Sequence, residues 1–231
     1  MIGLTKAKVD FLIQNVGKLY TLEEDGLPAG PRRRGDLGRV GLVEDAWLAA
    51  YDGEIVALGR QDDVRAAITV LPGATVVDAG GAAVIPGFVD PHTHAVFDEP
   101  RSWEFGRRLT GESYTAIAEA GGGIRASVRG FREVDEDELV RRTRRRLRAA
   151  LAYGSTTVEV KSGYGLDLES ELRALRLVAR LQGDPLLPDL VATCLAAHEF
   201  PDEWRDDREG YVALVCDEIL PAVAAEGLAE R

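Results

Sequence analysis

The stretch VIPGFVDPHTHAVF, residues 84–97, decides the fold and holds two of the chain's three histidines. Its first half is a nearly continuous apolar run, typical of a strand that is buried on both faces of a parallel sheet. Its second half places His92 and His94 two residues apart, and residues i and i+2 of a strand lie on the same side. The stretch therefore predicts a buried strand that ends in two converging imidazoles.

Two converging neutral imidazoles suit a borderline divalent ion such as zinc or iron. Asp90, two residues before His92, could support a ligand by a hydrogen bond or cap the turn. The H-x-H pattern is a weak signal by itself, and its alternative is a pair of hydrogen-bonded core histidines. Its position after an apolar strand that opens a β/α series favours the metal site.

Beyond residue 83, strand and helix patterns alternate, as in a parallel sheet with crossover helices. Candidate functional residues follow each strand directly, namely His92 and His94, then Tyr164, then His198. In (β/α) barrels the active site lies at that edge of the sheet. We therefore expect an α/β fold with a TIM-type barrel, incomplete in this chain, although three strands alone do not exclude a doubly wound sheet. The predicted strands cover residues 82–94, 155–165 and 189–198, and the predicted helices cover 135–153, 167–182 and 208–225.

The first part of the chain has a different pattern, since it consists of short β-like runs separated by turns. Residues 1–82 predict a small β-rich domain of the composite-sandwich type, and residues 83–231 the N-terminal part of the barrel. The Asp52-Gly53 pair between two apolar runs predicts a hairpin. Residues 28–39, rich in proline, glycine and arginine, predict an exposed loop.

Composition excludes several classes of protein. The formal net charge of −11 argues against a nucleic-acid binder. The arginines that cover the polar side of the helix at 135–153 are therefore interpreted as a solvated face, namely Arg141, Arg142, Arg144, Arg145 and Arg148. No stretch approaches the roughly 20 apolar residues that span a bilayer, and the N-terminus has no signal-peptide pattern. The two cysteines lie far apart, without a metal-binding spacing. We expect a cytoplasmic protein that contacts neither membrane nor nucleic acid.

At this point the sequence becomes recognisable. PGFVDPHTH, after a β-rich region with a DGEIVALG turn, resembles the metal-dependent hydrolases of the amidohydrolase superfamily. HTHAVFDEPRSWEFGRRLTGESYTAIAEAGGGI, TTVEVKSGYGLDLESELRALR, AAHEFP and CDEILPAVAAEGLAE are similar to the imidazolonepropionase family. The resemblance covers essentially the whole chain. It implies a hydrolase of histidine degradation that opens the cyclic amide of 4-imidazolone-5-propanoate to N-formimino-L-glutamate. It also implies one bound zinc or iron ion, and this small molecule as the binding partner. Assembly into a homodimer is left open.

The same resemblance implies roles for five residues. His92 and His94 would ligate the metal, and Arg101, Tyr164 and His198 would bind substrate. An arginine can hold a propanoate carboxylate through two parallel hydrogen bonds, while tyrosine and histidine can hydrogen-bond the ring. Spacing alone favours other roles, namely Arg101 as a surface partner of Glu99 or Glu104 and Tyr164 as a packed turn residue. The resemblance reverses this preference.

Other positions are interpreted more simply. Gly121, Gly122 and Gly123 form either a flexible lid or a plain loop, Lys161 is structural, and Cys194 is a small buried hydrophobe. In the family, a third histidine, an aspartate and a catalytic acid come from strands that would lie beyond residue 231. No catalytic residue is therefore assigned, and activity of these 231 residues alone is not expected. Another cyclic-amide hydrolase or deaminase, and a non-catalytic barrel fragment, remain alternatives.

Overall fold

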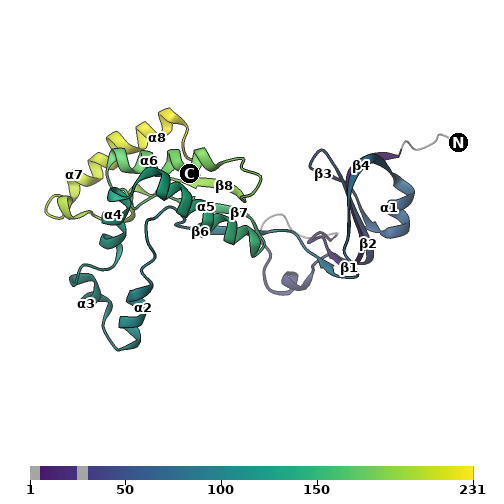
Figure 1. Cartoon of the computed structure of the whole chain (residues 1–231), viewed down its shortest axis with the longest axis horizontal. Coiled ribbons are helices and arrows are strands. Elements are labelled where there is room, and N and C mark those ends of the chain that lie inside the picture. The colour runs from purple at the N-terminus through teal and green to yellow at the C-terminus, as the bar shows by residue number, and fades with distance from the viewer. Residues whose placement is uncertain (1–5, 25–30, 231) are drawn as a thin grey trace. The chain divides into compact units, whose positions relative to one another are not determined.

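The computed structural model describes residues 6–24 and 31–230. It divides into two compact units, Met1–Pro86 and Gly87–Arg231 (Figure 1). The boundary falls slightly later than the expected one after residue 82, because the short strand Ala83–Val84 pairs with the first strand of the first unit.

The first unit is a five-stranded sheet with one helix. The strand order is β3-β2-β1-β4, with β5 also paired to β1. The predicted hairpin is confirmed: Asp52 and Gly53 join β2 to β3 with φ angles of 52° and 80°, as a type I′ turn requires. A second sheet layer, which a sandwich needs, is absent from residues 6–24 and 31–86. The elements are β1 (Ala7–Tyr20), a 3₁₀ turn (Arg34–Gly38), β2 (Leu42–Tyr51), β3 (Glu54–Arg60), α1 (Gln61–Ala67), β4 (Ile68–Asp78) and β5 (Ala83–Val84).

The predicted loop at residues 28–39 lies partly outside the described residues, since the structure describes it only from residue 31. That part is largely exposed and includes the short 3₁₀ turn. The prediction of an exposed loop is thus confirmed for residues 31–39.

The second unit is a mixed α/β fold around three parallel strands in the order β6-β7-β8. The connection from β6 to β7 contains α2, α3, α4 and α5, and α6 connects β7 to β8. The mixed α/β fold is thus confirmed, whereas the described residues do not close a barrel. The elements are β6 (Phe88–Thr93), α2 (Ser102–Leu109), α3 (Tyr114–Glu119), α4 (Ile124–Glu133), α5 (Glu136–Ala152), β7 (Ser155–Lys161), α6 (Leu168–Leu181), β8 (Asp189–Thr193), two 3₁₀ turns (Ala196–His198 and Asp202–Trp204), α7 (Arg208–Ala213), a π-helical segment (Leu214–Ile219) and α8 (Leu220–Glu226).

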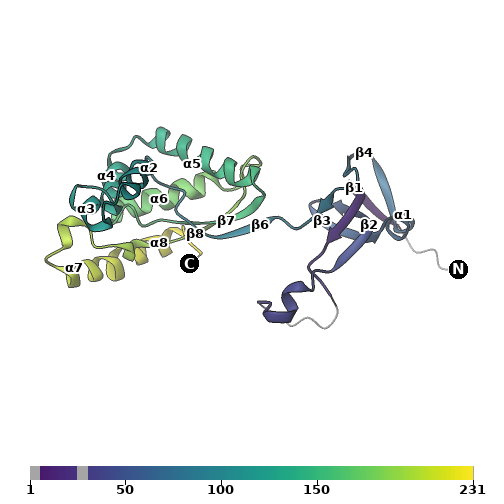
Figure 2. The ribbon, with the colours of Figure 1, turned by 90° about the horizontal axis from the view of Figure 1, so that it is seen from below.

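The first two predicted helices are confirmed, and they begin at the predicted N-cap residues. Asp135 caps α5 by accepting the N–H groups of Asp137 and Glu138, and Asp167 caps α6 by accepting that of Ser170. Figure 2 shows α5, α6 and α8 side by side. Apolar side chains of these helices pack with side chains of α4, β7, β8 and the π-helical segment in two adjoining clusters on one face of the sheet. The clusters include Phe131, Leu139, Leu147, Val158, Val160, Leu175, Leu177, Leu190, Ile219 and Val223.

The last predicted helix is confirmed, but it is not a regular α-helix. Between α7 and α8 the chain makes a π-helical segment, Leu214–Ile219, immediately before Pro221. Proline has no N–H to donate to the carbonyl four residues earlier, so the regular ladder is interrupted there. No described helix combines the length and the apolar character that a membrane span needs.

One prediction about β6 is wrong. The strand is not buried on both faces, since Phe88 is 55% and Val89 66% exposed. The core of this unit lies on the face covered by α5 and α6, where Val158 and Val160 of β7 are buried. An apolar run therefore indicated the strand correctly, but it could not indicate which faces other elements cover.

Candidate metal and substrate site

His92 and His94 lie at the carboxyl end of β6 with ring centroids 5.5 Å apart. The alternation of strand side chains thus brings the two imidazoles together, as predicted. Between them, the Thr93 hydroxyl donates to the carbonyl of Glu159 on β7 at 2.6 Å. This bond ties the end of β6 to the neighbouring strand, while His92 stays exposed and His94 is half-buried.

His94 is the centre of a group of rings that come from all three strand ends. Its imidazole stacks on that of His198, which follows β8, with centroids 4.6 Å apart. The ring of Tyr164, which follows β7, lies 5.1 Å from that of His94 and 5.6 Å from that of His198. Residues separated by up to a hundred positions in the sequence therefore meet at one sheet edge, as the strand-end argument predicted.

The surroundings of His94 keep its imidazole neutral. Burial is the main cause that lowers its pKa to about 4, and the neighbouring positive charges of His198, His92 and Lys161 lower it further. Neutral imidazole is the form that ligates a metal. Its Nδ1 atom is buried and makes no hydrogen bond within residues 6–24 and 31–230.

The two imidazoles fit part of a metal site. A neutral, half-buried imidazole with an unpaired buried nitrogen, beside a second imidazole, matches two nitrogen ligands of zinc or iron. In the part of the chain that the structure describes, no group of three His, Cys, Asp or Glu residues could hold a metal ion. Asp90 accepts the backbone N–H of His92 at 3.3 Å. This bond matches the interpretation of Asp90 as a cap of the turn, because it goes to the backbone and not to an imidazole ring.

Arg101 lines a cavity of about 490 Å³ together with His94 and Tyr164. Its Nη1 atom lies 3.6 Å from Oε1 of Glu104, an ion pair that is too long for a hydrogen bond. That nitrogen is buried and has no hydrogen-bond partner among the described residues. Arg101 thus pairs with Glu104, but not at the surface, because Glu104 is buried. The same arginine also lines the cavity beside His94.

The glycine-rich loop after α3 packs against this arginine. Gly123 has a φ of 68°, and its N–H donates to Glu104 at 2.7 Å. A methyl group on Gly123 would lie 3.7 Å from the hydroxyl of Tyr114 and 3.8 Å from Nη1 of Arg101. Tyr114 and Arg101 thus both lie beside Gly123. Sequence reasoning missed Tyr114, because a lone tyrosine at the start of a helix carries no spacing signal.

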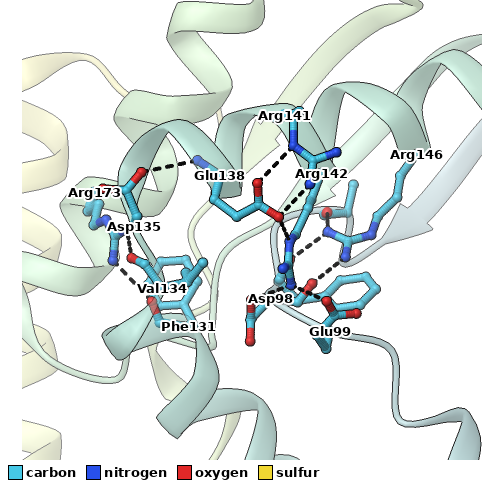
Figure 3. Close-up of polar contacts among 12 residues, drawn as sticks. Asp98, Glu99, Phe131, Val134, Asp135, Glu138, Arg141, Arg142, Arg146 and Arg173 are labelled. Atoms are coloured by element: carbon cyan, nitrogen blue, oxygen red, sulfur yellow. Dashed lines mark hydrogen bonds and ion pairs between the residues drawn. The ribbon is translucent and has the colours of Figure 1, made fainter.

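Two arginines of α5 hold the segment that joins His94 to Arg101 (Figure 3). Arg146 lies over the ring of Phe97, 3.5 Å from its centroid, and donates to backbone carbonyls of residues 95, 97 and 98. Burial lowers the pKa of Arg146 to about 10. Arg142 binds the carboxylate of Asp98 at 2.6 Å.

This arrangement corrects one sequence interpretation. Arg142 was expected on a solvated face, but its side chain is mostly buried against the loop, where it binds Asp98, Glu99 and Glu138. Helical periodicity shows which side of a helix is polar, but a loop that lies far away in the sequence can cover that side.

A polar group lies on the open face of the sheet. Glu159 of β7 accepts from the ammonium of Lys161 and from the hydroxyl of Thr193 on β8. Burial alone would raise the pKa of Glu159, but these two hydrogen bonds, together with the charges of Lys161 and His92, lower the pKa overall. Lys161 is thus engaged by a carboxylate, in line with a structural role. Cys194 is half-buried and packs against apolar residues, as predicted, and burial raises its pKa.

Comparison with known proteins places the chain in context. No family model matches it. Imidazolonepropionase of Symbiobacterium thermophilum is 47% identical over 223 residues, which are 96% of this chain and 51% of that protein. The imidazolonepropionase of Herpetosiphon aurantiacus is 45% identical over 94% of this chain and 48% of its own length. That of Geobacillus kaustophilus is 42% identical over 94% and 51%.

Solved structures give more distant likenesses. An adenosine deaminase from Xanthomonas campestris with bound zinc has a TM-score of 0.47 at 18% identity, over 97% of this chain and 54% of that one. The ochratoxinase of A. niger has a TM-score of 0.44 at 17% identity, over 81% and 31%. The chain spans about half the length of the curated relatives it matches. Over nearly all of its own length, the chain is a homologue of imidazolonepropionase.

Proposed function

We propose that this chain carries the first metal ligands and the substrate-binding residues of a hydrolase that opens 4-imidazolone-5-propanoate to N-formimino-L-glutamate. One observation carries the proposal. In a chain 47% identical to an imidazolonepropionase, one cavity is lined by a neutral imidazole, a tyrosine and an arginine whose buried nitrogen makes no hydrogen bond in the described structure. The substrate needs one group for its ring and one for its carboxylate, and this cavity offers both.

Arg101 would hold the propanoate. Its buried Nη1 atom is free of hydrogen bonds within residues 6–24 and 31–230, and a guanidinium binds a carboxylate through parallel hydrogen bonds. Fixing the propanoate would turn the ring of the substrate toward His94 and save the entropy of orientation in the reaction.

Tyr164 and His198 would hold the ring. Burial raises the pKa of Tyr164, so its hydroxyl stays neutral and can donate to the ring carbonyl. Nδ1 of His198 lies 2.9 Å from the carbonyl of Gly163. A carbonyl only accepts, so Nδ1 must carry the proton, and Nε2 of the neutral ring can then accept from a ring N–H.

His92 and His94 would hold one zinc or iron ion. When bound, such an ion supplies Lewis-acid chemistry that activates water for attack on a carbonyl. We propose that the remaining metal ligands and the acid that moves the proton come from the part of the family's length that this chain does not span. Within residues 6–24 and 31–230, no group of three His, Cys, Asp or Glu residues could hold a metal ion.

The test is a binding experiment on the whole chain. Imidazole-4-propanoate and its carboxamide are titrated by calorimetry into the zinc-treated protein, into Arg101→Met and into Arg145→Met. Arg145 is exposed on α5 and serves as the control. We expect the acid to bind at least about tenfold more tightly than the amide, since a hydrogen bond to a charged group contributes roughly 1.5–3 kcal/mol. Arg101→Met should abolish this preference. Equal binding of acid and amide by the unmodified chain would refute the proposal.

A further inference from the structure

Glu171 of α6 is a fully buried carboxylate, 0% exposed, close to the candidate site. Its Oε1 atom accepts the N–H groups of Gly163 at 3.1 Å, Gly165 at 2.9 Å and Leu166 at 2.8 Å. Its Oε2 atom shares the N–H of Gly163, also at 3.1 Å. A buried charge is costly unless it is well hydrogen-bonded, and here backbone N–H groups supply those bonds.

The segment that these bonds hold is a turn in unusual backbone conformations. Gly163 has a φ of 101° and Leu166 a φ of 58°. Such conformations persist only where the surroundings enforce them, especially for a residue with a branched side chain such as Leu166. The buried carboxylate accepts hydrogen bonds from three backbone N–H groups of the turn, and these bonds therefore hold the turn in this conformation.

The same turn reaches the candidate site at two points. The carbonyl of Gly163 faces Nδ1 of His198 at 2.9 Å, and the next residue is Tyr164, whose ring lies 5.1 Å from that of His94. The space at Gly163 is also tight, since a methyl group there would lie 2.9 Å from Cβ of His198. A shift of this turn would therefore move both residues proposed to hold the substrate ring.

We propose that Glu171 is a positioning residue of this site. By fixing the turn 163–166, it sets the Gly163 carbonyl that selects the Nδ1–H tautomer of His198, and it sets the place of Tyr164 beside His94. Only the consequence for ligand binding rests on the proposed function. The effect on the His198 tautomer is independent of it.

The primary test reads the tautomer of His198 by long-range ¹H–¹⁵N NMR at pH 8, in the unmodified chain and in three variants. Glu171→Gln keeps one acceptor oxygen but replaces the other, which also accepts the Gly163 N–H at 3.1 Å, by an amide NH₂ group that repels this N–H. We expect the Nδ1–H fraction to fall from predominant to below half. Glu171→Asp keeps the charge but shortens the side chain, and we expect an intermediate value. Glu169→Gln, at an exposed position on the same helix, should not change the tautomer. If Glu171→Gln does not fold, the Asp variant alone decides.

A folded Glu171 variant with the unmodified chain's tautomer would overturn the proposal. The second readout is affinity for imidazole-4-propanoate, with His198→Ala as reference. We expect Glu171→Gln to weaken binding about as much as His198→Ala does. If His198→Ala weakens binding and Glu171→Gln does not, Glu171 has no positioning role in recognition and the proposal fails. If His198→Ala binds normally while Glu171→Gln shifts the tautomer, the positioning of His198 stands and the proposed substrate role of His198 fails.

Discussion

The imidazole of His94 lies almost parallel to that of His198, with ring centroids 4.6 Å apart and planes inclined by 14°. One ring ends the first strand of the sheet and the other follows the third strand. Two imidazoles stacked this closely repel each other when both are protonated. The contact therefore favours a neutral His94, in addition to the effect of burial.

The first prediction concerns the protonation of His94 in metal-free protein. Its pKa of about 4 lies below the ordinary value of 6.5, so between these values the unfolded chain binds a proton that the folded chain does not. Stability should accordingly fall as the pH drops from 6.5 toward 4. Proton NMR of the imidazoles measures the pKa directly. In His198→Ala the pKa of His94 should rise, because one repelling charge and part of the burial are removed. A His94 that titrates near 6.5 in the unmodified chain would contradict this assignment.

The second prediction concerns metal binding by His92 and His94. Calorimetric titration of the chain with zinc should show weak binding, since two neutral imidazoles form only part of a ligand set. His92→Ala should lose this binding and keep its far-UV circular dichroism, because His92 is exposed and has no packing role. Cys216→Ser is the control for the exposed thiol and should bind zinc normally. Undiminished zinc binding by both His92→Ala and His94→Ala would mean that these histidines are not the ligands.

The third prediction concerns the turn before Tyr164. Gly163→Ala puts a methyl group 2.7 Å from the carbonyl oxygen of Leu195 at a φ of 101°. Gly183→Ala meets nothing within 4 Å at a φ of 76°, so it is a control for the backbone strain alone. We expect Gly183→Ala to cost about 1–2 kcal/mol of unfolding free energy. Gly163→Ala should cost about 1–3 kcal/mol more, as overpacking does. Urea denaturation measures both, and equal losses would show that the crowding at Gly163 is unimportant.

The fourth prediction concerns the segment between His94 and Arg101. Arg146→Met keeps much of the packing on Phe97 but leaves three backbone carbonyls without their donor. Each unsatisfied buried group costs about 1–3 kcal/mol, although water can satisfy those that become exposed. Hydrogen exchange should therefore quicken in residues 95–101 and stay unchanged at Val158 and Val160. Arg145→Met is the matched control on the same helix. Unchanged exchange in residues 95–101 of Arg146→Met would refute the anchoring role.

Local patterns predicted the elements well because local physics determines them. Asp135 and Asp167 are N-caps in both the sequence and the structure, and the stripe with Leu139 and Leu147 packs inward as its spacing indicated. His92 and His94 meet because a strand alternates. Tyr164 and His198 join them because parallel strands end at one edge. Each of these conclusions needs only periodicity and topology.

What the sequence could not predict depends on long-range contacts. Glu171 looked like one more charged helix residue, since only the folded turn shows that its carboxylate collects three backbone N–H groups. Arg142 was expected on a solvated helix face, but its guanidinium binds Asp98 and Glu99 of a loop that lies far away in the sequence. Burial of β6 was overestimated because apolar composition does not show which faces are covered.

The last prediction is that purified residues 1–231 alone do not turn over 4-imidazolone-5-propanoate. The chain has three histidines in all, and no group of three His, Cys, Asp or Glu residues in the described structure could hold a metal ion. We therefore expect these residues to supply neither a complete ligand set nor the acid that moves the proton, and general acid–base assistance alone is typically worth about 10²–10⁴-fold in rate. The assay follows the ultraviolet absorbance of the substrate with zinc or ferrous iron in excess, and a full-length imidazolonepropionase is the positive control. Turnover near that of the control, by protein of confirmed mass, would show that a second copy or residues interpreted here as structural complete the site.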